Sequence, residues 1–216
     1  HYPNHIKSKL PKAGTTIFSV MSALANEYKA INLSQGFPNF DVSEELISLV
    51  NHYMKKGMNQ YAPSQGIISL RERIAEKVQD LYGATYNPES EINITSGGTQ
   101  AIYTAITAMI REGDEVLIFE PAYDSYAPAI LLAGGIPVYM QLIAPDYSID
   151  WTKVKKLITQ KTKMIIINTP HNPAGTVLTS KDMKELEKIT SNSDITIISD
   201  EVYEHLIFDG IEHQSI

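Results

Sequence analysis

Residues 163–168 read KMIIIN, and this short stretch contains four consecutive apolar side chains, Met164 to Ile167. A strand with one exposed face alternates apolar and polar residues, whereas a strand covered on both faces is continuously apolar. The stretch therefore predicts a strand that is buried on both sides, as in a parallel sheet. It decides the fold class, because parallel strands need crossover connections, usually helices, between them.

The sequence on either side of this stretch alternates between strand and helix patterns. We predict strands at 91–95, 115–119, 137–141, 163–168 and 195–199, separated by helices at 99–113, 123–135, 149–159 and 180–190. Further amphipathic helices are predicted at 17–28, 43–57 and 66–83. This order indicates a three-layer α/β fold with a mostly parallel sheet and right-handed crossovers.

Composition excludes several classes of protein. The 216 residues are 43% hydrophobic and 20% charged, as is typical of soluble globular proteins. A net charge of -7 provides no basic surface for nucleic acid. The chain has no cysteine for a disulfide or thiolate site and no apolar run of the roughly 20 residues that span a membrane. We expect a cytoplasmic protein with no metal site and no nucleic-acid or membrane partner.

The stretch TSGGTQ, residues 95–100, precedes a predicted helix and could bind an anion. Gly97 and Gly98 would let the backbone approach a phosphate group, and the free N–H groups that begin a helix would bind it. The stretch is neither a P-loop nor a dinucleotide motif, so a small phosphate ester is the candidate ligand. A tight turn without any ligand would show the same short pattern, and the sequence alone leaves both readings open.

Two predicted strands end in polar residues, at the edge where parallel sheets bind ligands. Asn172 follows His171 and could donate to a ligand oxygen, whereas His171 itself is expected to be a structural hydrogen-bonding residue. Asp200 ends the last predicted strand, and a buried carboxylate there must be paired with a cation or a donor. A protonated pyridine nitrogen would satisfy that need, and so would a salt bridge to a nearby lysine.

Taken together, seven motifs in this order closely resemble the class I/II pyridoxal-phosphate (PLP) dependent aminotransferases of fold type I. The motifs are SKLPKAGTTIF (8–18), INLSQGFPNFD (31–41), QYAPSQGIISLRE (60–72), ITSGGTQAIYTAI (94–106), DEVLIFEPAYDSYAPAI (114–130), NTPHNPAGTV (168–177) and ISDEVYEHLIFDG (198–210). Within the family, the sequence looks most like the methionine and kynurenine aminotransferase branch. The resemblance implies a transaminase of amino acid metabolism that moves an amino group from methionine or an aromatic amino acid to a 2-oxo acid.

The resemblance also implies a division into domains. Residues 1–42 would form an N-terminal arm and a segment of the small domain. Residues 43–216 would form the N-terminal part of the large PLP-binding domain, whose sheet is of the seven-stranded type and incomplete in this chain.

Roles for individual residues follow from the same resemblance. Asp200 matches the partner of the pyridine nitrogen, and Asn172 and Tyr203 match two donors to the phenolic oxygen of the ring. Asp200 and Tyr203 are thus the catalytic residues expected in this chain, while Tyr123 matches the aromatic residue that stacks on the ring. The phosphate is implied to bind at three residues: Gly98, Thr99 and Gln100.

Three residues of the first third of the chain are implied to act at the same site. Tyr61 matches a tyrosine that reaches the phosphate site of the neighbouring subunit, which implies a homodimer with shared active sites. Gly36 matches a backbone contact to the substrate carboxylate, and Phe18 matches a wall of the side-chain pocket. Asn172 is implied to contact the substrate as well as the cofactor.

The Schiff-base lysine of this family is missing from the chain. It is expected in a Ser-x-x-Lys context a few tens of residues after the D-x-x-Y motif, whereas the chain ends thirteen residues after Tyr203, and its last lysine, Lys188, precedes Asp200. We therefore expect an N-terminal portion of a longer enzyme that also lacks the substrate-binding arginine. The alternatives are a non-catalytic PLP-binding or dimerisation module and a PLP-dependent β-lyase acting on cysteine conjugates.

Overall fold

The computed structural model describes residues 7–11, 14–36 and 38–216. Its chain divides into two compact units, of which one spans 14–94 and the other contains 95–216 together with 7–11. The predicted domain boundary between residues 42 and 43 stays a prediction.

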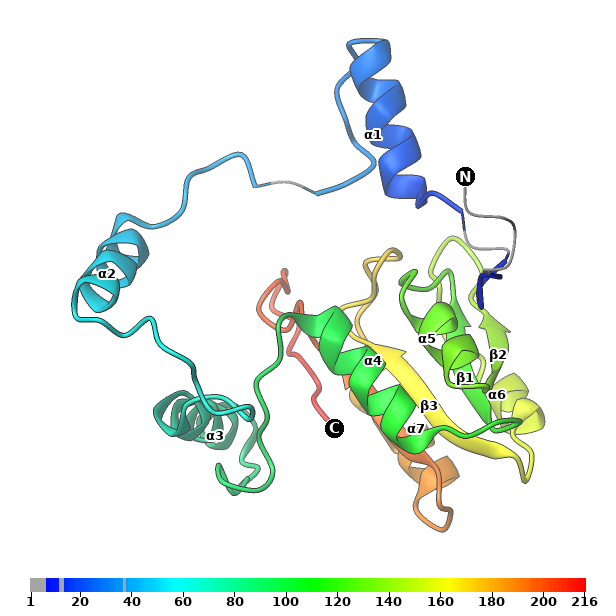
Figure 1. The fold of residues 1–216 in the computed structure, drawn as a ribbon. Coiled ribbons are helices and arrows are strands. Elements are labelled where there is room, and N and C mark those ends of the chain that lie inside the picture. The colour runs from blue at the N-terminus through cyan, green and yellow to red at the C-terminus, as the bar shows by residue number, and fades with distance from the viewer. Residues whose placement is uncertain (1–6, 12–13, 37) are drawn as a thin grey trace. The chain divides into compact units, whose positions relative to one another are not determined.

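A four-stranded parallel sheet forms the centre of the unit that contains residues 95–216 (Figure 1). The strands are β1 (Glu115–Glu120), β2 (Ile136–Gln141), β3 (Thr162–Asn168) and β4 (Thr196–Asp200), in the spatial order β2-β1-β3-β4. All three strand pairs are parallel, and the last residues of β3 and β4, Asn168 and Asp200, lie opposite each other. The predicted α/β class with a parallel sheet is confirmed.

Helices cover both faces of this sheet (Figure 1). The first face is covered by α4 (Gly98–Met109) and α5 (Tyr126–Leu132), and the second by α6 (Trp151–Leu157) and α7 (Ser180–Thr190). The unit therefore has the three layers that the alternating pattern predicts.

The continuous apolar run in β3 supplies side chains to both faces. Met164 and Ile166 pack in the hydrophobic core under α4 and α5, whereas Ile165 and Ile167 pack in the core under α6 and α7. These four side chains are at most 2% exposed. The alternation arises because successive side chains of a strand point to opposite faces of the sheet.

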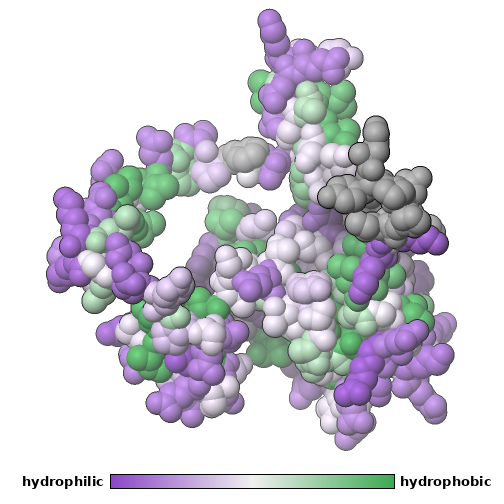
Figure 2. Space-filling view, in the orientation of Figure 1, coloured by the Kyte–Doolittle hydropathy of each residue, from purple (hydrophilic) through white to green (hydrophobic). Residues whose placement is uncertain are grey.

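The other unit carries three helices, α1 (Ile17–Glu27), α2 (Glu44–Lys55) and α3 (Ile68–Tyr82). Neither α1 nor α2 has a buried residue, and hydrophobic side chains lie on the surface of α1 in Figure 2. Arg71 of α3 is buried, and its guanidinium donates to the carbonyl oxygens of Gly66, Pro88 and Glu89. This arginine holds the loops on both sides of its helix together.

The predicted strand at 91–95 is wrong, since these residues have no strand structure. Their alternation of polar and apolar residues is typical of a strand, but a strand also needs a neighbour for its ladder of hydrogen bonds. The Ile94 N–H instead donates to the carbonyl oxygen of Gln65 at 3.0 Å. Its side chain fills the space beside Gly66, where an added Cβ would lie only 2.3 Å from Ile94 Cγ1.

Within the described residues, no helix has the length and apolar character needed to cross a membrane. The same residues contain no group of three acidic, histidine or cysteine side chains that could hold a metal ion. The cytoplasmic location stays a prediction.

Candidate functional site

A cavity of about 180 Å³ lies at the edge of the sheet where β3 and β4 end. Six of the residues that line it were assigned to the site from the sequence. The described residues that line it are Gly98, Thr99, Ile102, Tyr123, Asn168, Asn172, Asp200, Val202 and Tyr203. The fold thus brings together residues that are up to 105 positions apart in the sequence, from Gly98 to Tyr203.

One wall of the cavity is the N-terminus of α4. Gly97 is the N-cap residue and has a φ of 91°, a conformation that favours glycine, and Gly98 begins the helix. The first N–H groups of a helix have no acceptor within the helix and carry its positive dipole end, so they favour an anion. The Gln100 side-chain oxygen accepts from the Ser96 N–H at 2.6 Å, and Gln100 is not among the residues that line the cavity. Its role in phosphate binding stays a prediction.

Tyr123 supplies an aromatic ring to the same cavity. Its hydroxyl lies 3.3 Å from Thr99 Oγ1, within hydrogen-bond distance. The ring of Tyr126 contacts it edge-on, with ring centroids 5.7 Å apart and planes at 74°. Tyr123 is therefore held both by its hydroxyl and by the packing of its ring.

The Asp200 carboxylate is the only acidic group that lines the cavity in the described structure. Its Oδ2 accepts a hydrogen bond from the Tyr126 hydroxyl at 2.6 Å, and its Oδ1 accepts from the Val202 N–H at 3.3 Å. Burial, followed by the bond to Asp200, raises the pKa of Tyr126 well above its ordinary value, so this phenol stays protonated. The sequence indicated a cation or a donor for Asp200, but it did not identify Tyr126 as that donor.

Asn168 is a second residue that the sequence reasoning missed. It is 5% exposed, and its side chain joins the ends of two segments of the site. Its Nδ2 donates to the carbonyl oxygen of Asp200 at 2.8 Å, and its Oδ1 accepts from the Asn172 N–H at 2.6 Å. The signal was present in the sequence, because a polar residue ends an otherwise apolar buried strand.

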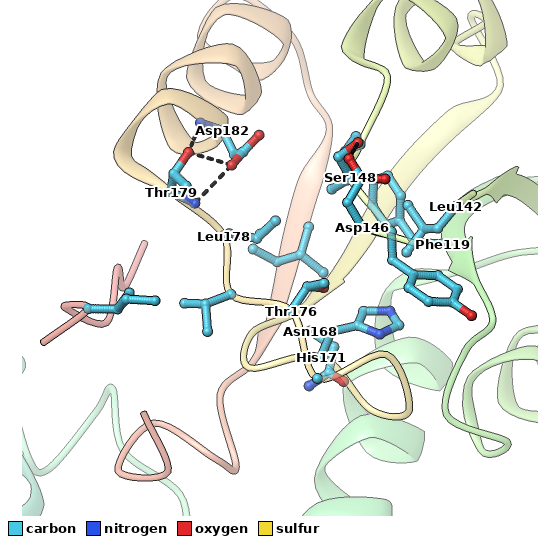
Figure 3. Close-up of a pocket in the computed structure, with 16 residues that line it drawn as sticks. Phe119, Leu142, Asp146, Ser148, Asn168, His171, Thr176, Leu178, Thr179 and Asp182 are labelled. Atoms are coloured by element: carbon cyan, nitrogen blue, oxygen red, sulfur yellow. Dashed lines mark hydrogen bonds between the residues drawn. The ribbon is translucent and has the colours of Figure 1, made fainter. Parts of the chain in front are cut away.

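A larger cavity of about 390 Å³ shares Asn168 with the first one (Figure 3). None of the residues predicted for cofactor binding lines it. His171 points into this cavity, and its Nδ1 accepts from the Ala174 N–H at 3.3 Å. Burial lowers the pKa of His171, so the imidazole is neutral at pH 7. These contacts are those of a structural residue, as the sequence predicts.

Three predicted residues lie in the other unit. The Tyr61 side chain is fully exposed, Gly36 is exposed, and Phe18 is half-buried in α1. Their roles in substrate binding and across a dimer interface stay predictions. Lys188 lies on α7, where it pairs with Glu185 at 2.6 Å and does not line the smaller cavity.

Comparison with known proteins agrees with this arrangement. The family profile of aminotransferase class I and II matches residues 28–216. The chain is similar to the methionine aminotransferase of Escherichia coli strain K12, with 49% identity over 97% of this chain and 54% of the relative. It is also similar to the kynurenine–oxoglutarate transaminase of Dictyostelium discoideum, with 35% identity over 93% of this chain and 50% of the relative.

A solved structure shows the same similarity in three dimensions. The crystal structure of an Escherichia coli protein reported to have a methionine aminotransferase function superposes with a TM-score of 0.95 and 49% identity, over 99% of this chain and 56% of that chain. The chain spans about half the length of the curated relatives it matches. The profile, the relatives and the structure lead to one conclusion, that the chain belongs to the class I and II aminotransferase family.

Proposed function

We propose that this chain carries the cofactor-binding part of a PLP-dependent aminotransferase, which moves an amino group from an amino acid to a 2-oxo acid. Members of the class I and II family use pyridoxal phosphate. The observation that carries the proposal is that a helix N-terminus, an aromatic ring and a carboxylate meet in one cavity.

The charges around this cavity fit the charges of the cofactor. None of the nine lining residues in the described part of the chain is basic, so an anion would be held by the N–H groups at the start of α4. Asp200 would attract a positively charged group. A ligand that carries an anion and a cation on one flat ring satisfies both ends, and pyridoxal phosphate with a protonated ring nitrogen is such a ligand.

Each polar residue then has a defined task. Asp200 would accept the N–H of the ring, and Asn172 and Tyr203 would donate to its phenolic oxygen. Tyr123 would stack on the ring, whose bound form withdraws electrons from the Cα of the amino acid. The protein therefore supplies binding, orientation and charge, while the cofactor supplies the electron sink.

The proposed amino donor is methionine or an aromatic amino acid. The names of the similar proteins from Escherichia coli and Dictyostelium discoideum refer to methionine and kynurenine. The donor is tested by assaying the complete protein with methionine, phenylalanine and kynurenine against a panel of 2-oxo acids. If none of the three amino acids is converted to its 2-oxo acid, the proposed donor class is wrong.

Asp200 offers the sharpest test of the reaction itself. In the complete protein, Asp200→Asn should retain bound PLP but lose most transamination, because a neutral amide cannot favour a protonated ring nitrogen. Asp200→Ala should lose both. Asp194→Asn is the control, since Asp194 is exposed and does not line the cavity. Full turnover in Asp200→Asn would overturn the role of the carboxylate.

The proposal includes a homodimer with shared active sites. It is supported by the fully exposed Tyr61 side chain and by the absence of buried residues in α1 and α2. If Tyr61 acts in the partner's site, a mixed dimer of Tyr61→Ala and Asp200→Ala subunits has one site with both defects and one intact site. Mixing the two inactive variants should therefore restore activity. No restoration in a mixture that forms mixed dimers would contradict sharing.

A further inference from the structure

A short hydrogen bond to the candidate site comes from a residue that does not line it. Tyr126 begins α5, is 3% exposed and packs in the core under α4 and α5. Its hydroxyl donates to Asp200 Oδ2 at 2.6 Å, across 74 positions of sequence. Because Asp200 lines the cavity and Tyr126 does not, the phenol contacts the carboxylate from the interior of the unit.

This contact has two physical effects on Asp200. A hydrogen bond from a neutral donor to an ionised acceptor is roughly twice as strong as one between neutral groups, so it holds the carboxylate in one orientation. It also engages Oδ2, whereas Oδ1 has only the longer 3.3 Å bond from the Val202 N–H. Oδ1 is therefore the oxygen with more capacity to accept a further donor.

Tyr126 also supports the aromatic wall of the cavity. Its ring contacts the Tyr123 ring edge-on at 5.7 Å, an arrangement that aromatic pairs prefer. One buried side chain thus touches both the residue expected to stack on the cofactor ring and the residue expected to pair with its nitrogen. Packing involves the Tyr126 ring, and the carboxylate contact involves only its hydroxyl.

We propose that Tyr126 is a positioning residue, whose hydroxyl orients the Asp200 carboxylate so that Oδ1 meets a protonated cofactor nitrogen. This inference rests on the proposed function, because it concerns the same cavity and the same ligand. Beyond that function, two residues, Asp200 in the cavity and Tyr126 outside it, would together keep the ring nitrogen of the cofactor protonated.

The test distinguishes the contribution of the Tyr126 hydroxyl from that of the Tyr126 aromatic ring. The complete protein is loaded with PLP labelled with ¹⁵N at the ring nitrogen, and the ¹⁵N chemical shift is recorded for wild type, Tyr126→Phe and Asp200→Asn. Tyr126→Phe should move the signal from the protonated position toward that of Asp200→Asn. PLP affinity, measured by titrating the apoprotein, should fall about tenfold, because a carboxylate that is no longer oriented makes a weaker charge-assisted bond to the ring N–H.

Two further proteins control for packing. Tyr139→Phe removes a hydroxyl from an exposed tyrosine of β2 and should leave both readings unchanged. Replacement of Tyr126 by 4-aminophenylalanine keeps a donor at the same place and should restore the protonated signal, and it also serves if Tyr126→Phe does not fold. A merely structural ring would give no such rescue.

The outcomes distinguish this inference from the proposed function. If Tyr126→Phe shows the ¹⁵N chemical shift and the PLP affinity of wild type, Tyr126 does not have the proposed role, and the aminotransferase proposal stays intact. The same is true if 4-aminophenylalanine at position 126 gives the signal of Asp200→Asn. Wild-type protein that binds no PLP would instead overturn the proposed function.

Discussion

Replacing Asn168 by alanine should loosen the loop that carries Asn172. The Asn172 N–H donates to Asn168 Oδ1 at 2.6 Å, and Asn168→Ala removes this acceptor from a buried position. The Asp200 carbonyl also loses a donor, but it keeps the Thr169 N–H at 3.0 Å. The main loss of stability in this loop therefore comes from the Asn172 N–H, which is left without an acceptor.

The magnitude follows from this accounting of hydrogen bonds. An unpaired buried donor costs about 1–3 kcal/mol, and we take about 1 kcal/mol for the Asn172 N–H because Asn172 is only half-buried. Because 1.4 kcal/mol corresponds to a factor of about ten, the amide hydrogen of Asn172 should exchange with solvent about fivefold faster. PLP affinity should fall as well, since the loop would no longer hold Asn172 in one place.

Hydrogen exchange of the apoprotein, followed by NMR or by mass spectrometry of the peptide that contains Asn172, measures this change directly. Asn192→Ala is the matched control, because Asn192 is exposed in the turn before β4 and should leave the exchange of Asn172 unchanged. If Asn168→Ala changed the exchange rate less than twofold, Asn168 would not be what holds this loop.

Three further predictions concern stability in urea unfolding. Burial and a carboxylate neighbour raise the pKa of Tyr126, so only the unfolded state loses the phenol proton just above pH 10. The free energy of unfolding should therefore fall by about 1.4 kcal/mol per pH unit above pH 10. Tyr126→Phe should make this pH dependence flatter. Burial lowers the pKa of His171, so the free energy of unfolding should fall as the pH drops below about 6.5, where only the unfolded state gains the proton. His171→Gln should remove that loss of stability. The same pH dependence in His171→Gln as in wild type would contradict this prediction. Gly135→Ala would place a methyl group 2.6 Å from Ile110 Cγ2 and should cost about 1–3 kcal/mol. In the comparison variant Gly113→Ala, the added methyl group meets no atom within 4 Å, but Gly113 has a φ of 84°, so about 1–2 kcal/mol of backbone strain is expected. A Gly135→Ala protein as stable as wild type would contradict the packing argument.

Local patterns predicted most of the sheet and its helices because each element buries its own repeating side chains. The predicted helix 180–190 has the same bounds as α7, and the predicted strand 163–168 differs from β3 by one residue. The prediction for 91–95 failed because alternation describes one strand, whereas a ladder needs two. Ile94 found its partners in the turn at Gln65 and Gly66 instead.

The candidate site was predictable to the extent that its residues stand in motifs. Gly98, Asn172 and Asp200 were assigned because the motifs around them resemble those of a known family, and the structure places them in one cavity. Tyr126 and Asn168 could not be assigned, because each contributes through a contact that depends on the fold. A tyrosine in an apolar helix is ordinarily a core residue, and only the distance to Asp200 distinguishes this one.

The register of the sheet connects the fold to the chemistry of the site. Side chains of β3 alternate between the two cores, so Asn168 follows Ile166 on the face covered by α4 and α5. Asp200 lies opposite Asn168 and follows Ile198 on the same face, which is also the face of Tyr126. A slip of one residue in β4 would turn Asp200 toward the opposite face. It would then lose the phenol of Tyr126 and the helix N-terminus together. The apolar residues that hold β3 and β4 in register are therefore as necessary to the site as its polar groups.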